Sequence, residues 1–368
     1  MTRLQMRCYH HTCFMRDFVR EHLAVSEARI VRPPGHAEIL NDICLFAHFD
    51  VGDRVDPYVL SYLRALHDAG FSIVFVTACA ISAEDEKRVR EFCCDVIRRA
   101  NSGLDFGSWS DAFQLYRNRF KGRLLLANDS VYGPMGNLKE ILSRLTAEKS
   151  DFYGLVECNK IALHLQSWFL LFEPHVIASN TFHDILSQDF GKMSKIDVVR
   201  NGEVGLTQKL QAAGFHHRAM VTFSNGHPLG RIAFNPMHVL WREMLEKERV
   251  PFVKVEVLRD RLSRRQRETA IQYFFPEWKL MINKHIKRMI LKPISSTGNE
   301  EKKPFLHNFK LLIYLASTRL IYTLFHYNMR LAANLLSLVL RWLHHFMRGG
   351  GSVRCKRIFI RRNEFKIF

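Results

Sequence analysis

Several features that would assign this chain to a familiar class of protein are missing from its sequence. Its eight cysteines show no paired Cys-x-x-Cys spacing, and several lie in apolar runs where a small hydrophobic residue suits a core. No stretch of about 18 apolar residues runs without a charge, and the first residues lack the order of a secretion signal. We therefore expect a cytoplasmic protein that neither crosses nor spans a membrane.

One short segment carries ligands of the kind that bind zinc. Cys8-Tyr-His-His-Thr-Cys13 places two cysteines and two histidines close together. A structural zinc site needs four well-spaced ligands, and no second pair is evident along the chain. The segment alone is a weak indication of a metal site.

Acidic residues are missing near the end of the chain. Between Lys302 and Asn363 there are twelve lysines or arginines and no aspartate or glutamate, so this stretch carries most of the net charge of +18. Such a charge attracts polyanions, which include nucleic acid, an anionic membrane and a phosphorylated substrate.

The polar residues of this stretch fall on one narrow stripe of a predicted helix, and the rest of its circumference is apolar. The stripe consists of Arg319, Thr323, His326, Arg330, Asn334, Ser337, Arg341, His344 and Arg348. This pattern predicts a helix lying on an anionic membrane surface. A core helix packed on the rest of the chain is one alternative, and a nucleic-acid site of arginines beside aromatic residues is another.

Apolar runs and helical patterns alternate in the first two thirds of the chain. Strands are predicted at 43–48, 72–77, near 96–97, 123–127, 152–156 and 167–172, and helices at 58–69, 83–94, 138–148, 205–213 and 239–248. A further helix is predicted through Tyr116. The alternation is typical of an open, largely parallel α/β sheet with helices on both faces, which binds ligands at the carboxyl ends of its strands.

Changes of composition divide the chain. Arg32-Pro33-Pro34-Gly35 closes an N-terminal extension at 1–40, and an α/β domain is predicted at 41–260. The five arginines between Arg259 and Arg267 indicate an exposed connector, with a basic helical connector at 261–303. The amphipathic segment at 304–350 and a basic tail at 351–368 follow.

The predicted strand that ends at Ala127 runs directly into Asn128, Asp129 and Ser130. A carboxylate at the end of a buried strand is well placed to hold a divalent cation on a diphosphate. Alternatively, these polar residues cap the turn or helix that follows.

A glycine-containing loop between Arg99 and Trp109 is the second candidate. Gly103 and Gly107 allow close approach of a backbone, while Asn101 and Asp105 offer polar contacts to a ribose or diphosphate. Glycine-rich turns that begin helices are common, so the pattern alone has low specificity.

The third candidate is a polar pair in an otherwise apolar strand. Gln166 and Ser167 precede Trp168, whose flat ring is suited to covering a sugar. A core aromatic residue beside a hydrogen-bonded glutamine gives the same pattern.

The fourth candidate is the turn around Glu203, which delivers one carboxylate to the start of an amphipathic helix. Such a carboxylate either complements the helix dipole or accepts the proton of an attacking hydroxyl group.

Taken together and in this order, the four segments resemble the rhamnan synthesis protein F family. Further matching pieces span about residues 43 to 260: Asp56-Pro57-Tyr58, Asp151-Phe152-Tyr153-Gly154, Asn235-Pro236-Met237-His238 and Pro251-Phe252-Val253-Lys254. The resemblance implies a glycosyltransferase of bacterial polysaccharide assembly, with a GT-A type mixed sheet that binds a nucleotide sugar.

The resemblance also implies roles for the candidate residues. The loop with Asn101, Gly103, Asp105 and Trp109 would face the nucleotide sugar. Asp129, beside Asn128, would hold the metal and diphosphate, and Glu203 would be the base of an inverting displacement. Gln166, Ser167 and Trp168 would contact substrate. The implied partners are a donor such as dTDP-rhamnose, a lipid-linked glycan acceptor, Mg²⁺ or Mn²⁺, and the inner face of the cell membrane.

Two departures from the family pattern bear on this interpretation. Asn128-Asp129-Ser130 keeps one carboxylate of the usual Asp-x-Asp metal motif, which puts metal dependence in question. The loop reads Asn-Ser-Gly-Leu-Asp where the family is expected to have Asn-Lys-Gly-Tyr-Asp, so a lysine that could meet phosphate is lost. A membrane-associated scaffold that has lost catalysis is therefore the alternative function.

Overall fold

The computed structural model describes residues 42–222 except 118, and residues 235–291 except 263, 272, 273 and 275. The chain divides into two compact units, residues 1–299 and 300–368, so every described residue belongs to the first unit. The predicted N-terminal extension, zinc-type segment, amphipathic helix and basic tail lie outside the described residues.

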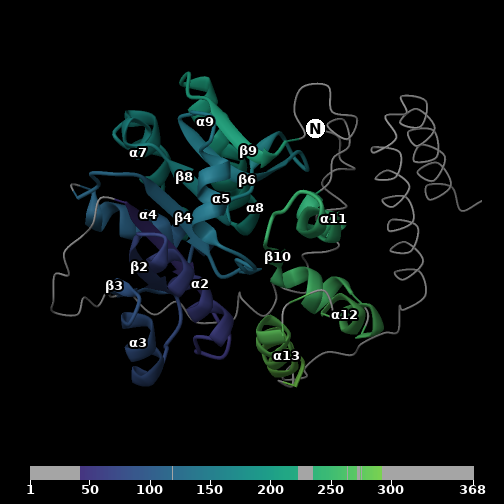
Figure 1. Ribbon diagram of the computed structural model, residues 1–368. Helices are drawn as coiled ribbons and strands as arrows, with labels where there is room; N and C mark the ends of the chain where they lie inside the picture. The colour runs from purple at the N-terminus through teal and green to yellow at the C-terminus, as the bar shows by residue number, and fades with distance from the viewer. Residues whose placement is uncertain are drawn as a thin grey trace, which may run out of the picture. The chain divides into compact units, whose positions relative to one another are not determined.

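The described residues form a mixed sheet with helices packed against it (Figure 1). Its strands follow the order β3-β2-β1-β4-β8-β6-β7, and β9 pairs with β6. The strands are β1 (Ile43–His48), β2 (Ser72–Thr77), β3 (Cys93–Arg98), β4 (Leu124–Asn128), β6 (Phe152–Cys158), β7 (His164–Leu165), β8 (Phe169–Phe172) and β9 (His217–Val221). The pairs among β1, β2, β3 and β4 are parallel, whereas β8 is antiparallel to β4 and β6. The predicted α/β class is confirmed.

Helices cover both faces of the central strands, which explains why all six residues of β1 are buried. Alternate β1 residues point to opposite faces: Leu45 packs with the core that includes Trp109, whereas Phe46 meets Tyr62 edge to face. The helices after these strands are α2 (Pro57–Asp68), α3 (Ala83–Arg90), α4 (Leu104–Tyr116) and α5 (Leu138–Leu145).

The segment after β8 is a series of short helices. They are α6 (Pro174–Ile177), α7 (Asn180–Leu186), a 3-10 turn (Phe190–Lys192), α8 (Lys195–Val198), a π-helix (Val199–Val204) and α9 (Gly205–Ala212). The π-helix runs directly into α9, so Glu203 lies at a widened turn. Such turns are frequent at functional sites.

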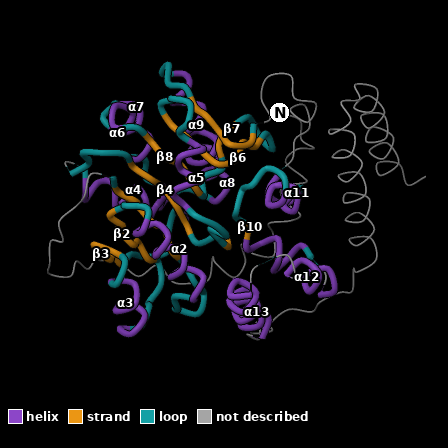
Figure 2. Tube along the Cα trace, in the orientation of Figure 1, coloured by secondary structure: helices purple, strands orange, loops and turns teal. Residues whose placement is uncertain are grey.

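A small group of elements gathers beside the sheet (Figure 2). It contains α10 (Pro236–Val239), α11 (Trp241–Glu246), β10 (Val253–Lys254), a second π-helix (Val257–Arg261), α12 (Arg264–Ile271) and α13 (Pro276–Leu291). β10 pairs antiparallel with β5 (Val131–Tyr132), which follows β4 directly, and α13 packs on α2. Residues far along the chain are thereby brought to the end of β4.

Some predicted elements differ from those observed. The helix expected over 83–94 ends at Arg90, because Cys93 already pairs with Ile73 of β2. The helix expected over 239–248 is two shorter helices. The exposed connector expected at Arg259–Arg267 is a π-helix and the start of α12, and Arg267 donates hydrogen bonds to the carbonyl oxygens of Leu258 and Arg259. Its guanidinium satisfies helix-end carbonyls that would otherwise lack donors.

Candidate functional site

Two neighbouring side chains at the end of β4 point in different directions. Asn128 Nδ2 donates to Asp105 Oδ2 over 2.9 Å, toward the start of α4. Asp129 Oδ2 instead accepts from the backbone N–H of Phe49 over 3.0 Å, beyond the end of β1. Successive residues of an extended chain point to opposite faces, so only one of the two reaches the glycine loop.

The glycine loop contributes Asp105 to this site, while its Gly103 has a packing role. Gly103 has φ +69°, and a Cβ there would lie 2.7 Å from the carbonyl carbon of Phe190. The position therefore requires glycine for its backbone angle and for its contact with Phe190. Asn101 is exposed, and Trp109 is fully buried in the core, where its Nε1 donates to Ala127 O over 3.2 Å. The predicted contact of Trp109 with a nucleotide sugar is therefore corrected to a core role.

Lys254 reaches the same place from β10. Its Nζ donates to Ser130 Oγ over 3.2 Å and lies 5.8 Å from the ring centre of Trp168. Burial lowers the pKa of Lys254, and the negative charges of Glu203, Glu256 and Asp105 oppose that shift. The charges of Asp105, from the glycine loop, and of Glu203, from the π-helix, thus act on Lys254.

Glu203 is partly buried beside the predicted polar pair. Its Oε1 accepts from the backbone N–H of Ser167 over 3.3 Å. The preceding Gly202 lies against the ring of Phe106, where a Cβ would come within 2.7 Å of a ring carbon. Since Phe106 belongs to the first turn of α4, this contact seats the π-helix on the helix that follows the glycine loop.

The segment Gln166–Trp168 lines the site from inside the fold. Trp168 is 1% exposed, packs against Phe252, and donates from Nε1 to Gln166 Oε1 over 3.0 Å. Gln166 Nε2 in turn donates to Asn235 Oδ1 over 3.2 Å. The expectation that Trp168 offers an open face to a sugar is corrected: it is the core aromatic residue of the alternative interpretation, and it supports Lys254.

Asp129 belongs to a second group of polar residues at the ends of β1 and β2. Its Oδ2 lies 3.8 Å from His48 Nε2, and its carbonyl oxygen accepts from the Tyr58 hydroxyl over 3.1 Å. His48 Nδ1 lies 3.0 Å from Thr77 Oγ1. Burial lowers the pKa of His48 to about 4, although the charge of Asp50 opposes the shift, so the ring is neutral at pH 7.

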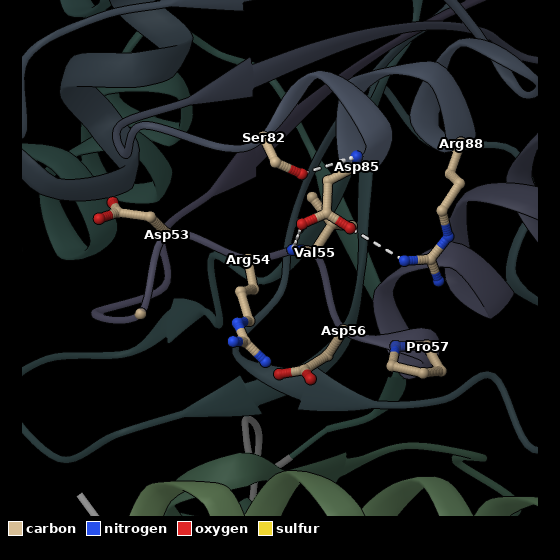
Figure 3. Close-up of a pocket in the computed structure, with 9 residues that line it drawn as sticks. Asp53, Arg54, Val55, Asp56, Pro57, Ser82, Asp85 and Arg88 are labelled. Carbon is tan, nitrogen blue, oxygen red and sulfur yellow. Dashed lines mark hydrogen bonds and ion pairs between the residues drawn. The ribbon is translucent and has the colours of Figure 1, made fainter.

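A cavity of ≈ 450 Å³ opens at the carboxyl ends of β1 and β2 (Figure 3). Asp85 of α3 accepts from the backbone N–H of Val55 over 3.3 Å and from Arg88 over 2.9 Å, which fixes one wall. The lining residues are Gly52, Asp53, Arg54, Val55, Asp56, Pro57, Ser82, Asp85 and Arg88. Charges of both signs and a location beyond parallel strands suit a polar ligand with an anionic part.

The predicted metal ligand Asp129 is not in a group of converging ligand atoms. Among the described residues, such a group is formed by Asp50, Asp56 and His285, whose ligand atoms lie within 4.8 Å of one another. Arg288 forms ion pairs with both carboxylates of this group. Asp129 lies outside this group, and its carboxylate accepts from the N–H of Phe49.

Lys254 was not among the candidate residues expected from the sequence. It lies in one of the pieces that carry the family resemblance, between Pro251 and Glu256. A lysine that alternates with apolar residues in a short strand was the available signal.

No helix among the described residues is long and apolar enough to span a membrane.

Comparison with known proteins adds two curated relatives. The chain is 30% identical over 159 residues to protein y4gN of Sinorhizobium fredii, covering 42% of each chain. It is 29% identical over 199 residues to virulence protein VirA of Vibrio anguillarum, covering 45% of this chain and 63% of that one. The chain thus spans about two fifths to three fifths of the length of these relatives.

Two solved structures show low similarity. The glycosyltransferase GlyE of Streptococcus pneumoniae matches with a TM-score of 0.38 and 14% identity, over 71% of this chain and 66% of that one. A cytidylyltransferase from Leptospira borgpetersenii matches with a TM-score of 0.34 and 11% identity, over 71% and 100%. At these values neither likeness bears on the reaction.

The model of the family described as rhamnan synthesis protein F matches residues 73–324. This range is more than half of the chain and holds Asp105, Asn128, Glu203 and Lys254. It starts and ends later than the segment 43–260 that holds the matching motifs. The chain belongs to the rhamnan synthesis protein F family.

Proposed function

We propose that this chain is a glycosyltransferase that moves a sugar from a nucleoside diphosphate donor to a growing cell-surface polysaccharide. The observation that carries the proposal is the approach of distant segments to the residues that follow β4. Asp105 accepts from Asn128, Lys254 donates to Ser130, and the charge of Glu203 acts on Lys254. Membership of a family named for the synthesis of a rhamnose polymer supports the same substrate class.

Glu203 is the general base of the proposed reaction. Its carboxylate accepts the proton of an acceptor hydroxyl group while that oxygen forms a bond to the anomeric carbon of the donor sugar. The bond between the anomeric carbon and the diphosphate oxygen breaks on the opposite face, which inverts the configuration. The contact with the N–H of Ser167 fixes the orientation of Glu203.

Lys254 supplies positive charge where the diphosphate leaves. A preorganised cation in a partly buried site stabilises developing negative charge more strongly than water does. Ser130 and Trp168 hold the ammonium group in position. Lys254 thereby takes the part that was expected of a cation at Asp129, and the carboxylate of Asp129 serves to join β4 to β1.

The cavity beyond β1 and β2 is the proposed place of the donor's nucleoside part. The finer proposals are rhamnose carried on thymidine diphosphate, a lipid-linked glycan acceptor, and attachment of the basic tail to the inner face of the membrane. A requirement for Mg²⁺ or Mn²⁺ stays a prediction, and the proposed reaction assigns no step to a cation.

The decisive experiment follows donor consumption by the full chain with lipid vesicles and a panel of nucleoside diphosphate sugars. We expect Glu203→Gln to lower turnover by about 10²- to 10⁴-fold, the range for loss of a general base, with an unchanged melting temperature. Glu246→Gln, at an exposed position of α11, is the matched control and should keep full activity. Equal turnover of wild type and Glu203→Gln would remove the assignment of the base.

A catalytically inactive scaffold is the second candidate function, because the chain keeps only one of the two carboxylates of the Asp-x-Asp motif. Calorimetry of the wild-type chain with a panel of nucleoside diphosphates separates the two functions. A transferase binds one member of the panel, whereas a scaffold that has lost the donor site binds none.

A further inference from the structure

Arg288 of α13 forms ion pairs with two carboxylates, one at each end of the same loop. Its Nη1 and Nη2 donate to Asp50 Oδ1 and Oδ2 over 2.9 and 2.8 Å, and Nη2 also contacts Asp56 Oδ2. The paired geometry with Asp50 is the bidentate arrangement in which a guanidinium gains both energy and direction. All three side chains are largely buried, with 17%, 9% and 14% of their surface exposed.

The two aspartates mark the ends of the loop that joins β1 to α2. Asp50 also accepts from the backbone N–H of Gly52 over 2.7 Å, so it fixes the first turn of this loop. Asp56 occupies the position before α2 where an aspartate usually caps the helix, yet its side chain makes no capping hydrogen bond. The carboxylate is directed to Arg288 instead.

The loop held in this way forms most of the cavity wall. Five of the nine lining residues belong to it: Gly52, Asp53, Arg54, Val55 and Asp56. Pro57, the first residue of α2, also lines the cavity. On the other side, Asp85 accepts from the N–H of Val55, and Asp53 accepts from the N–H of Ala80 over 3.0 Å. α3 and the segment between β2 and α3 hold the middle of the loop, and α13 holds its two ends.

Other residues on the same face of α13 also contact the rest of the protein, so Arg288 is not an isolated surface residue. His285 Nδ1 lies 2.7 Å from the hydroxyl oxygen of Tyr132, and His285 Nε2 lies 3.4 Å from Asp56. One turn earlier, Met281 Sδ accepts from the Ser61 hydroxyl of α2 over 3.4 Å. Residues 281, 285 and 288 follow the spacing of one helix face.

Removal of the guanidinium would leave two carboxylates close together in a poorly hydrated place. Like charges in such a site repel, and each carboxylate then loses its compensating partner. The loop would relieve this by moving Asp50 or Asp56 toward water. Its movement changes the shape of the cavity without touching Lys254 or Glu203.

We propose that Arg288 is a positioning residue: from α13 it holds both ends of the Asp50–Asp56 loop and thereby sets the affinity of the cavity for the nucleoside part of the donor. The proposal rests on the proposed function for the identity of the ligand. The hold of Arg288 on both ends of the loop, called the clamp below, is inferred from the contacts of Arg288 alone.

Two measurements on the full chain test the proposal separately. The first is hydrogen exchange of the backbone amides of residues 51–56 without ligand. We expect faster exchange in Arg288→Ala and Arg288→Lys than in wild type, because lysine keeps the charge but loses the bidentate fork. Lys287→Ala removes an exposed cation of the same helix and should leave exchange unchanged.

The second measurement is binding and turnover of the donor. We expect Arg288→Ala to raise the Kd of the nucleoside diphosphate and the KM of the donor by about tenfold or more while kcat changes by less than about threefold, the pattern of lost ground-state binding. Arg288→Lys, which is the milder change and guards against loss of folding, should shift the same quantities by a smaller factor. Lys287→Ala should match wild type.

The outcomes of these measurements are distinct. Unchanged exchange in folded Arg288→Ala and Arg288→Lys overturns the clamp. Faster exchange with unaltered Kd and KM, or a fall in kcat alone, overturns the link between the clamp and the donor. A wild-type chain that binds no member of the nucleoside diphosphate panel contradicts the proposed function and the named ligand, and the exchange data then decide the clamp by themselves.

Discussion

Asn128 donates its side-chain amide to Asp105 over 2.9 Å, which joins the end of β4 to the first turn of α4. Asn128 Oδ1 at the same time accepts from the hydroxyl and the N–H of Ser130. One amide therefore satisfies a carboxylate on one side and orients Ser130, a hydrogen-bond partner of Lys254, on the other. A carboxylate at position 128 could not donate to Asp105.

Asn128→Asp tests this relationship. We expect the free energy of unfolding at pH 7 to fall by about 1 to 3 kcal/mol, because Asp105 loses a donor and gains a like charge. Denaturant unfolding measures this fall, and it should become smaller at pH 5 as one carboxylate takes up a proton. Asn128→Ala, which removes the donor without adding charge, is the control. A loss of stability in Asn128→Asp that is equal at both pH values would contradict the explanation.

Lys254→Met tests the charge at the leaving group. We expect kcat to fall by about 10²-fold or more, in the range seen when a preorganised donor to a developing anion is removed. The measurement is donor turnover at saturating concentration, with circular dichroism to verify folding. Lys209→Met, at an exposed position of α9, is the control. Retained kcat in folded Lys254→Met would remove Lys254 from the reaction.

Gly103→Ala tests the assignment of this glycine to packing. We expect a loss of more than about 2 kcal/mol of stability, since the new Cβ meets the backbone of Phe190 and φ is +69°. Gly70 is a matched control, because it has φ +97° and a Cβ added there would have nothing within 4 Å. Gly70→Ala should cost about 1 kcal/mol of backbone strain. Thermal unfolding compares the two, and equal losses would show that packing on Phe190 is unimportant.

The neutral His48 predicts an acid-sensitive fold. Its pKa is lowered to about 4 by burial, whereas the unfolded chain has a value near 6.5, so the unfolded state binds the proton first. The contribution of His48 to stability is then complete above pH 6.5 and is lost as the pH falls from 6.5 toward 4. The loss at pH 4 is on the order of 3 kcal/mol, at about 1.4 kcal/mol for each unit of pKa shift.

Unfolding by urea at pH 7.0, 6.0, 5.0 and 4.5 measures this slope. His48→Asn keeps a polar partner for Thr77 and lacks the titrating ring, so its stability should depend less steeply on pH in this window. His285, whose pKa burial also lowers to about 4, keeps its contribution in the variant. Identical slopes for wild type and His48→Asn would mean that the pKa of His48 is the same in the folded and unfolded chain.

The family resemblance was correctly inferred from the sequence, because its motifs follow one another in order over some 200 residues and the family model matches 73–324. The two strands Ile43–His48 and Ser72–Thr77 were also predicted with the right bounds. Their continuous apolar runs of β-branched and aromatic residues suit strands buried on both faces. Local sequence was less informative at Cys93, where pairing with β2 rather than helix propensity decides the structure.

Short-range patterns were enough to predict the alternation of strands and helices, the buried strands and the polar residues at their ends, since each depends on residues a few positions apart. Packing of the folded chain settled which of Asn128 and Asp129 meets the glycine loop, made Trp109 and Trp168 core residues, and brought Lys254 to the strand ends. These outcomes depend on strand pairing and on contacts such as that between Arg288 and Asp50, 238 positions apart. No local pattern records a contact at that separation, because it exists only once the sheet and α13 have packed.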